Sequence, residues 1–248
     1  MRIMSLKGKV ALVTGAGKGI GKSIAQLFAQ EKAIVVCNSL SDSSLLTTKE
    51  IIDSNGKAMS LQFDITNKLQ VNSAVESIIK KYGKIDVLVN NAGRSAGMDL
   101  VHEMKEEVWD RTIAVCLKGC FLCSQAVIPS MIEHNYGKII NIASVRAETG
   151  LERDSAYSAA KSGIYGFTRS LAKEVAKYHI NVNAISPGII RVSDSAVLPW
   201  EEYEKIVPLG IGKPLDIANG ALYLSTDKSS YMTGQVLHIN GGWWPTMK

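Results

Sequence analysis

A strand-like run, a glycine-rich turn and a helical pattern follow one another near the start of the chain. Residues 10–13 are apolar, residues 14–21 read TGAGKGIG, and apolar residues then recur with helical spacing from Ile24 to Phe28. Glycines let the backbone turn tightly and let a pyrophosphate approach the helix N-terminus, where free N–H groups and the helix dipole favour an anion. The segment therefore predicts a strand–turn–helix unit with a phosphate site at its turn.

The same alternation continues along the chain. Further strand-like apolar runs lie at residues 34–37, 59–63, 87–89, 138–142, 181–185 and 236–239, with helix-like stretches between them. Buried parallel strands read as continuous apolar runs, and the helices that join them cover both faces of the sheet. The 248 residues are 46% hydrophobic, enough to bury a substantial core. We expect a single α/β domain over residues 1–248, a doubly wound parallel sheet with helices on both faces.

Three polar side chains form a candidate carbonyl-reduction site. Tyr157 and Lys161 are four residues apart, so a helix places them on one face. A free phenol titrates near ~10 and donates a proton at neutral pH, and a neighbouring ammonium favours its phenolate form. The Ser144 hydroxyl can hold a carbonyl oxygen as negative charge develops on it. The set predicts a general acid, its electrostatic partner and an oxyanion donor; the alternative is a surface tyrosine beside a solvated lysine.

With these motifs the chain resembles the classical short-chain dehydrogenase/reductase family over nearly its whole length. The resemblance rests on the glycine turn, the three polar residues above, and the segments Asn90-Asn91-Ala92-Gly93, Pro187-Gly188, Thr233-Gly234-Gln235 and Asn240-Gly241-Gly242. The overall sequence pattern is most similar to that of the 3-oxoacyl-carrier-protein reductase and sugar or polyol dehydrogenase branch. This resemblance implies a Rossmann-type fold and hydride transfer between a nicotinamide and a small ketone or secondary alcohol. It implies that Tyr157 is the acid/base, that Lys161 also holds the nicotinamide ribose and that Ser144 orients the carbonyl.

The resemblance and the motifs together predict the cofactor site. The residues expected there are Gly15, Gly17, Lys18, Gly19, Ile20, Gly21, Asn38, Ser39, Asp64, Ile65, Asn91, Ala92, Gly93, Tyr157, Lys161, Pro187, Gly188, Ile190 and Ser193. The resemblance places the residues after Asn90 near the adenosine ribose and the nicotinamide side. It places the Pro-Gly pair beside the nicotinamide ring.

The end of the second strand favours NADP over NAD. An NAD enzyme usually carries an acidic residue there to accept hydrogen bonds from the ribose 2′-hydroxyl, and this chain has Asn38. Asn38 and Ser39 can donate hydrogen bonds to a 2′-phosphate, and Lys18 offers a cation where NADP-using relatives resemble this chain. NAD remains the alternative cofactor. By resemblance Asp64 lies on the adenine side, although an aspartate ending a strand is often a helix cap.

Two positions depart from the family pattern. Cys116 stands where the family usually carries an asparagine that holds a water in a proton relay from the active-site lysine. A thiol is a weak hydrogen-bond partner, so we expect reduced turnover or an altered relay, and a catalytically impaired regulatory or sensor protein stays the alternative function. Val192 replaces a threonine that bonds the carboxamide, and Ser193 is the candidate substitute.

Four arginines predict an anionic substrate. Arg94, Arg146, Arg153 and Arg191 lie on loops that border the expected substrate mouth. Guanidinium groups bind carboxylate, phosphate or sulfonate through paired N–H donors, and we expect Arg146 or Arg153 to be the anchor. The competing interpretation is pairing of these arginines with the nearby acids Glu148, Glu152 and Asp154.

Two other motifs suggest different functions. Residues 16–23 nearly match the phosphate loop of ATPases, which requires Lys22 to face the phosphates, but the later motifs fit a dinucleotide enzyme. Cys116, Cys120 and Cys123 have the spacing of an iron–sulfur motif, but within a helix the same spacing puts three thiols on one buried face. Core packing is the better account, and no metal site is predicted.

The remaining composition predicts a cytoplasmic enzyme. The net charge of +5 is mild and its lysines are dispersed, so we infer no nucleic-acid binding. No apolar run approaches the ~20 residues of a membrane span, and four cysteines without a secretory signal favour reduced thiols. The resemblance implies a homotetramer, to whose interface Trp243 and Trp244 could contribute; the alternative is packing of both side chains within the chain. Residues 192–211, with Trp200 and Tyr203, are a candidate lid.

Overall fold

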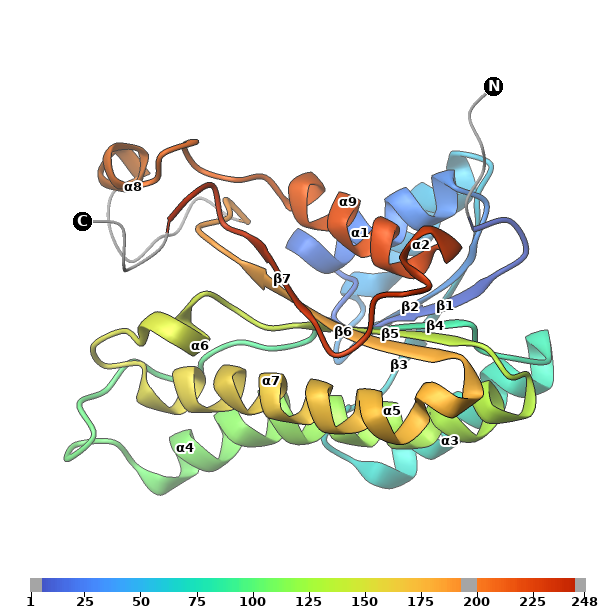
Figure 1. The fold of residues 1–248 in the computed structure, drawn as a ribbon, viewed down its shortest axis with the longest axis horizontal. Helices are drawn as coiled ribbons and strands as arrows, with labels where there is room; N and C mark the ends of the chain where they lie inside the picture. Colours follow the sequence, from blue (N-terminus) through green and yellow to red (C-terminus); the bar gives the residue numbers. More distant parts are fainter. Residues whose placement is uncertain (1–5, 193–199, 244–248) are drawn as a thin grey trace.

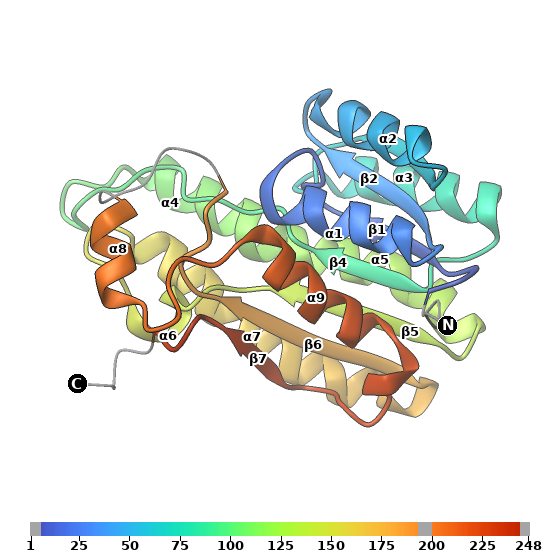
Figure 2. The same ribbon diagram turned by 90° about the horizontal axis from the view of Figure 1, so that it is seen from above.

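The computed structural model describes residues 6–192 and 200–243 and contains one seven-stranded parallel sheet. Its strands follow the order β3-β2-β1-β4-β5-β6-β7 (Figure 2). They are β1 Val10–Val13, β2 Ile34–Ser39, β3 Lys57–Gln62, β4 Val87–Asn90, β5 Gly137–Ile142, β6 Ile180–Pro187 and β7 Val236–Ile239. Each of the seven strand-like runs therefore forms a strand, which confirms the predicted parallel sheet. The order reverses between β1 and β4, where doubly wound sheets open a crevice for ligands.

Helices cover both faces of the sheet (Figure 1). One layer holds α1 Gly19–Gln30, α2 Ser43–Asp53 and α9 Pro214–Ser225, and the other holds α3 Lys68–Tyr82, α4 Glu106–Ile113, α5 Gly119–Glu133 and α7 Ser155–Val175. The shorter helices are α6 Arg146–Thr149 and α8 Trp200–Ile206, with 3₁₀ turns at Ala176–Tyr178 and Asp227–Ser229. This doubly wound arrangement is the one that the sequence predicts.

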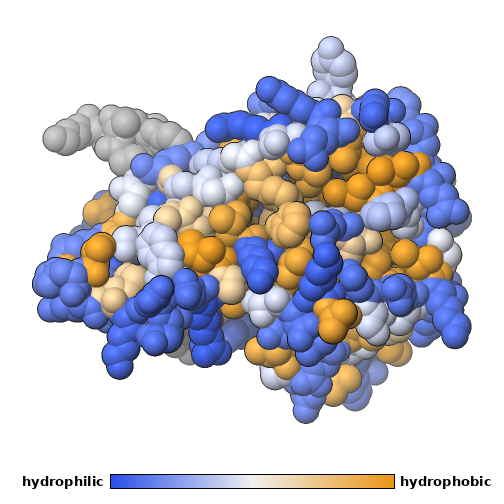
Figure 3. Space-filling view, turned by 90° about the horizontal axis from the view of Figure 1, so that it is seen from below, coloured by the Kyte–Doolittle hydropathy of each residue, from blue (hydrophilic) through white to orange (hydrophobic). Residues whose placement is uncertain are grey.

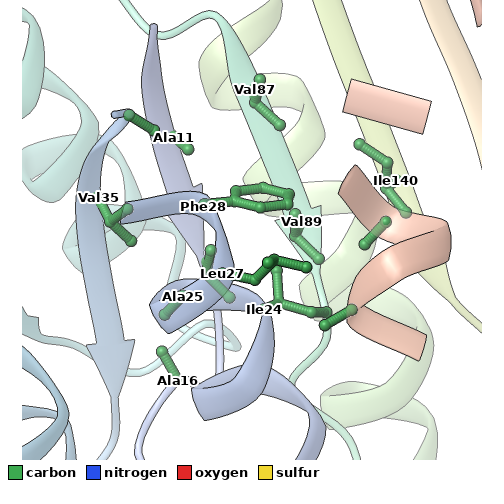
Figure 4. Packing of buried hydrophobic residues seen from close by; sticks show 14 of the residues in the cluster. Ala11, Ala16, Ile24, Ala25, Leu27, Phe28, Val35, Val87, Val89 and Ile140 are labelled. Carbon is green, nitrogen blue, oxygen red and sulfur yellow. The ribbon is translucent and has the colours of Figure 1, made fainter. Parts of the chain in front are cut away.

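Two apolar cores lie on opposite faces of the sheet. In β1, Ala11 and Val13 belong to the core under α1 and α9, whereas Val10 and Leu12 belong to the core over α3 and α5. Figure 4 shows Phe28 of α1 at the centre of the first core, among residues of β1, β2 and β4. Because both faces of β1 are buried, its sequence is apolar throughout instead of alternating.

A π-helical turn at Ala114–Lys118 joins α4 to α5, and the sequence does not predict it. The resulting continuous helix, Glu106–Glu133, is 28 residues long and has the length and apolar composition of a membrane span. Within its most apolar window, 44% of the residues are buried inside the fold. Apolar side chains remain exposed on this helix layer (Figure 3), and Trp109 and Phe121 are among those on the helix itself.

Candidate active site

A cavity of about 1020 Å³ lies at the carboxyl ends of the strands. Its lining comes from the segments that follow β1, β2, β3, β4, β5 and β6, and from α4, α7 and α8. All the predicted cofactor and catalytic residues line it except Ser193, which lies outside the described residues, as does Trp244. Fold topology thus brings together residues that are far apart in the sequence.

The glycine turn leaves no room for a side chain at Gly17 or Gly21. A Cβ atom on Gly21 would lie 2.3 Å from the carbonyl oxygen of Gly15, and Gly15 itself has a φ of +64°. The turn leads into α1, whose first turn has neither an acidic residue nor a side-chain cap from Lys18. Uncapped N–H groups at a helix N-terminus with close backbone access fit the pyrophosphate of a dinucleotide.

Asn91 holds this turn against the sheet. Its Nδ2 donates to the carbonyl oxygens of Thr14, at 2.9 Å, and Gly15, at 3.2 Å. The Thr14 hydroxyl accepts from the backbone N–H groups of Asn91 and Ala92. The Asn-Asn-Ala-Gly segment therefore positions the phosphate turn as well as lining the cavity.

The lysine of the near-match to an ATPase loop lies elsewhere. Lys22 Nζ forms an ion pair with Glu50 of α2 at 2.8 Å, and Lys22 does not line the cavity. The ATPase alternative requires this ammonium at the phosphates, so the structure removes its basis.

The donors at the end of β2 are largely engaged. Asn38 is 1% exposed, and its Nδ2 donates to the carbonyl oxygens of Phe63, at 3.0 Å, and Leu61, at 3.3 Å. The Ser39 hydroxyl donates to Ser41 O and accepts from the backbone N–H of Ser44. These bonds tie β2 to its neighbours. The exposed polar groups next to them in the lining are the hydroxyls of Ser41 and Ser43 and the ammonium of Lys18.

The Asp64 carboxylate is also partly engaged, because it accepts hydrogen bonds from the backbone N–H and the hydroxyl of Thr66, each at 2.8 Å. The helix that follows is capped by Asn67, whose side chain accepts from Leu69 and Gln70. Asp64 is therefore not the cap of that helix and remains in the cavity lining.

The three predicted catalytic residues converge on one side of the cavity. Ser144 follows β5, and Tyr157 and Lys161 lie one turn apart on α7. Lys161 is 2% exposed; its Nζ donates to Ile142 O at 2.6 Å and lies 5.4 Å from the centre of the Tyr157 ring. The backbone N–H of Arg146 donates to the Ser144 hydroxyl at 3.2 Å. A phenol, an ammonium and a hydroxyl thus face one volume, as proton transfer to a carbonyl requires.

Cys116 lies in the π-helical turn beside Lys161. A Cβ atom on Gly93 would lie 3.3 Å from Cys116 Sγ and 3.2 Å from Lys161 Nζ. Burial raises the pKa of the Cys116 thiol, and the Lys161 charge opposes this increase only in part. The thiol donates to Arg94 O at 3.4 Å. A neutral thiol thus occupies the position next to the active-site ammonium.

The other cysteines in this segment are core residues. Cys120 and Cys123 are buried, and burial raises the pKa of Cys123 to about 12. Cys120 Sγ donates to Asn141 Oδ1 at 3.2 Å. Among the described residues there is no group of three or more His, Cys, Asp or Glu side chains that could hold a metal ion.

The four predicted substrate arginines have different surroundings. Arg146 lines the cavity, but its Nη1 is paired with the buried carboxylate of Asp154. Arg153 Nε donates to Met98 O, and the Arg191 guanidinium lies 4.7 Å from the centre of the Trp200 ring. Neither of these two lines the cavity, whereas Arg94 does. Sequence reasoning missed Arg111, which lines the cavity from α4 and gives no signal in a helix rich in charged residues.

Comparison with known proteins gives a consistent picture. Residues 15–244 match a family model described as enoyl-(acyl carrier protein) reductase. The 3-oxoacyl-[acyl-carrier-protein] reductase of Thermotoga maritima is 44% identical over 244 residues, covering 96% of this chain and 99% of the relative. The BbsD subunit of (2S)-[(R)-hydroxy(phenyl)methyl]succinyl-CoA dehydrogenase of Thauera aromatica is 41% identical, with coverage of 96% and 98%. A crystal structure assigned as a candidate gluconate dehydrogenase of Agrobacterium tumefaciens superposes with a TM-score of 0.95 at 30% identity, covering all of both chains.

Proposed function

Because this chain belongs to the short-chain dehydrogenase/reductase family, we propose that it interconverts a ketone and a secondary alcohol with NADP(H), using Tyr157 as the acid/base. The chain is an oxidoreductase that acts on CH–OH or carbonyl groups. The observation that carries the finer proposal is the convergence of Ser144, Tyr157 and Lys161 in the cavity that the glycine turn also borders. A bound nicotinamide would supply or accept the hydride.

Each catalytic side chain has a separate task. The Ser144 hydroxyl orients the carbonyl oxygen and stabilises negative charge on it, and Tyr157 donates a proton to that oxygen in reduction or removes it in oxidation. The Lys161 ammonium, held by Ile142 O, would stabilise the negative charge left on the neighbouring phenol when it gives up its proton, and would donate a hydrogen bond to the nicotinamide ribose of a bound cofactor. The first test is a spectrophotometric assay of NADPH oxidation with 3-oxoacyl thioesters and keto acids; binding of NADPH without turnover of any carbonyl would favour the regulatory alternative.

The phosphate preference follows from the charges around the cavity beside β2. Asn38 brings no negative charge there, and Lys18, Ser41 and Ser43 offer an exposed cation and two hydroxyls. Asp42, between the two serines, does not line the cavity. We infer that these groups, and not the engaged donors of Asn38 and Ser39, bind a 2′-phosphate.

NADPH is therefore expected to bind more tightly than NADH, and Lys18→Ala should weaken NADPH binding about tenfold while leaving NADH binding nearly unchanged. Titration by nicotinamide fluorescence measures both affinities. Lys22→Ala is the matched control, because this lysine pairs with Glu50 outside the cavity. Equal affinity for the two cofactors, or equal losses from the two substitutions, would contradict the 2′-phosphate proposal.

Restoring an amide beside Lys161 should change catalysis. Cys116→Asn is expected to raise kcat about two- to tenfold and to change its pH profile, because an amide provides both a donor and an acceptor to a proton relay. Cys116→Ser tests whether a small hydroxyl suffices. Steady-state kinetics between pH 5 and 10 checks both variants, and an unchanged rate and profile for Cys116→Asn would show that the thiol does not limit proton transfer.

We also propose that the chain assembles as a homotetramer. The support is the exposed apolar side chains Trp109 and Phe121 on the α4–α5 helix; Phe121 forms an edge-to-face pair with the half-buried Phe167 of α7, with ring centres 6.3 Å apart. Large exposed apolar patches commonly mark contacts between subunits. Sedimentation velocity measures the assembly state directly.

A further inference from the structure

Among the described residues that line the cavity near Tyr157, every charged side chain is positive. The positively charged residues of the whole lining are Lys18, Arg94, Arg111, Arg146 and Lys161. Among the described residues of the lining, Asp64 is the one that carries a carboxylate. Asp64 follows β3, beyond the strands that carry the catalytic residues. Near Tyr157 the lining therefore offers three guanidinium groups and no described carboxylate.

Arg94 and Arg111 lie on two segments that pack against each other. The backbone N–H of Ala96 donates to the Thr112 hydroxyl at 3.2 Å, and Cys116 Sγ donates to Arg94 O at 3.4 Å. These bonds hold the loop after β4 along the helix that carries Arg111. Arg111 and Val115, one turn apart, both line the cavity, so this face of the helix is turned toward it.

No described carboxylate pairs with either guanidinium. Glu107 precedes Arg111 by one turn of α4, and none of the ion pairs between described residues involves Glu107, Arg111 or Arg94. Arg146 differs, because the buried Asp154 neutralises it. Of the three guanidinium groups in the lining, those of Arg94 and Arg111 are thus the two without a described carboxylate partner.

We propose that Arg94 and Arg111 together bind a carboxylate of the substrate, an inference that rests on the proposed reaction at Tyr157. Guanidinium groups bind carboxylates with paired N–H donors, so two of them on adjoining segments form a clamp. Arg111 precedes Cys116, the residue beside Lys161, by five residues, so the Cα atoms of the two residues lie roughly 7 Å apart along the helix axis. The substrate class is a keto acid or hydroxy acid whose carboxylate lies several bonds from the reacting carbon.

The test compares two probes of nearly the same shape, one an anion that only accepts hydrogen bonds and the other a neutral amide. Isothermal titration of 5-oxohexanoate and 5-oxohexanamide into the protein, with and without NADP⁺, should show a preference for the carboxylate of roughly tenfold or more. Arg94→Gln and Arg111→Gln should each lower carboxylate affinity roughly tenfold and leave amide affinity unchanged. The matched control is Arg169→Gln, because Arg169 is an exposed arginine of α7 outside the cavity lining.

Each outcome decides one point. Equal binding of the two probes, or no binding of the carboxylate up to tens of millimolar, would overturn the clamp. Loss of the preference in Arg146→Gln alone would transfer the anchor to Arg146 and also overturn it. Failure of NADP⁺ to bind would instead contradict the proposed function, and the carboxylate preference of the free protein would still be measured.

Discussion

Replacing Tyr157 with phenylalanine is expected to lower kcat by roughly 10²- to 10⁴-fold, because the reacting oxygen loses its proton donor. We expect the ring to stay in place, because Tyr157 belongs to α7 and its ring lies beside Lys161. Among the described hydrogen bonds, none that holds the fold uses the Tyr157 hydroxyl. NADPH affinity should therefore change little. Single-turnover kinetics and a fluorescence titration on the same preparation separate the two effects.

The control for this substitution is Tyr165→Phe. Tyr165 lies two turns farther along the same helix, is buried, and donates to Ser144 O at 3.4 Å. Burial raises its pKa to about 12, so its phenol stays protonated and is not a base near neutral pH. A loss of activity in Tyr165→Phe as large as that in Tyr157→Phe would contradict the account, because the Tyr165 hydroxyl holds the Ser144 backbone and is assigned no proton transfer.

Lys161→Ala is expected to damage both catalysis and cofactor binding. The substitution removes the charge that stabilises the Tyr157 phenolate and the donor to the nicotinamide ribose, and it leaves Ile142 O without its 2.6 Å partner. We expect kcat to fall by at least roughly 10²-fold and NADPH affinity to fall roughly tenfold or more. Stopped-flow binding and steady-state rates measure the two losses separately.

Lys161→Met distinguishes charge from packing, because methionine fills much of the buried space of the lysine stem without the ammonium. If both variants lose activity and affinity to a similar extent while Lys161→Met keeps the thermal stability of the original protein, the charge is responsible. Near-normal activity in Lys161→Met would contradict the role assigned to the ammonium.

The fold was predictable because the strands of a doubly covered parallel sheet are apolar on both faces. The run at β1, for example, is continuous in sequence and splits between two cores in the structure. The π-helical turn at residues 114–118 was not predictable, since the sequence AVCLK suits an ordinary helix equally well. That turn nevertheless carries Val115 into the cavity wall and places Cys116 beside Gly93 and Lys161.

The motif residues of the site could be selected from the sequence because each motif has a recognisable spacing. Partnerships between side chains could not. The sequence predicts that Asn38 faces a phosphate, but its amide donates to the carbonyl oxygen of Leu61 in β3, which is 23 residues away in the sequence. Three acidic residues lie near Arg146 in the sequence, and in the structure the ion pair forms with Asp154. Arg111 lies in a charged helix with no motif around it, so only the fold reveals its place in the cavity.

The most direct test of the proposed reaction is isotope transfer from NADPH carrying deuterium at C4 of the nicotinamide. The 4R- and 4S-labelled cofactors are each incubated with the protein and a set of keto acids and 3-oxoacyl thioesters, and the alcohols are analysed by mass spectrometry. The account predicts that one of the two labels reaches the carbinol carbon, and that Tyr157→Phe lowers its rate of transfer by roughly 10²-fold or more. Binding of NADPH with no deuterium transfer from either label to any carbonyl would contradict it.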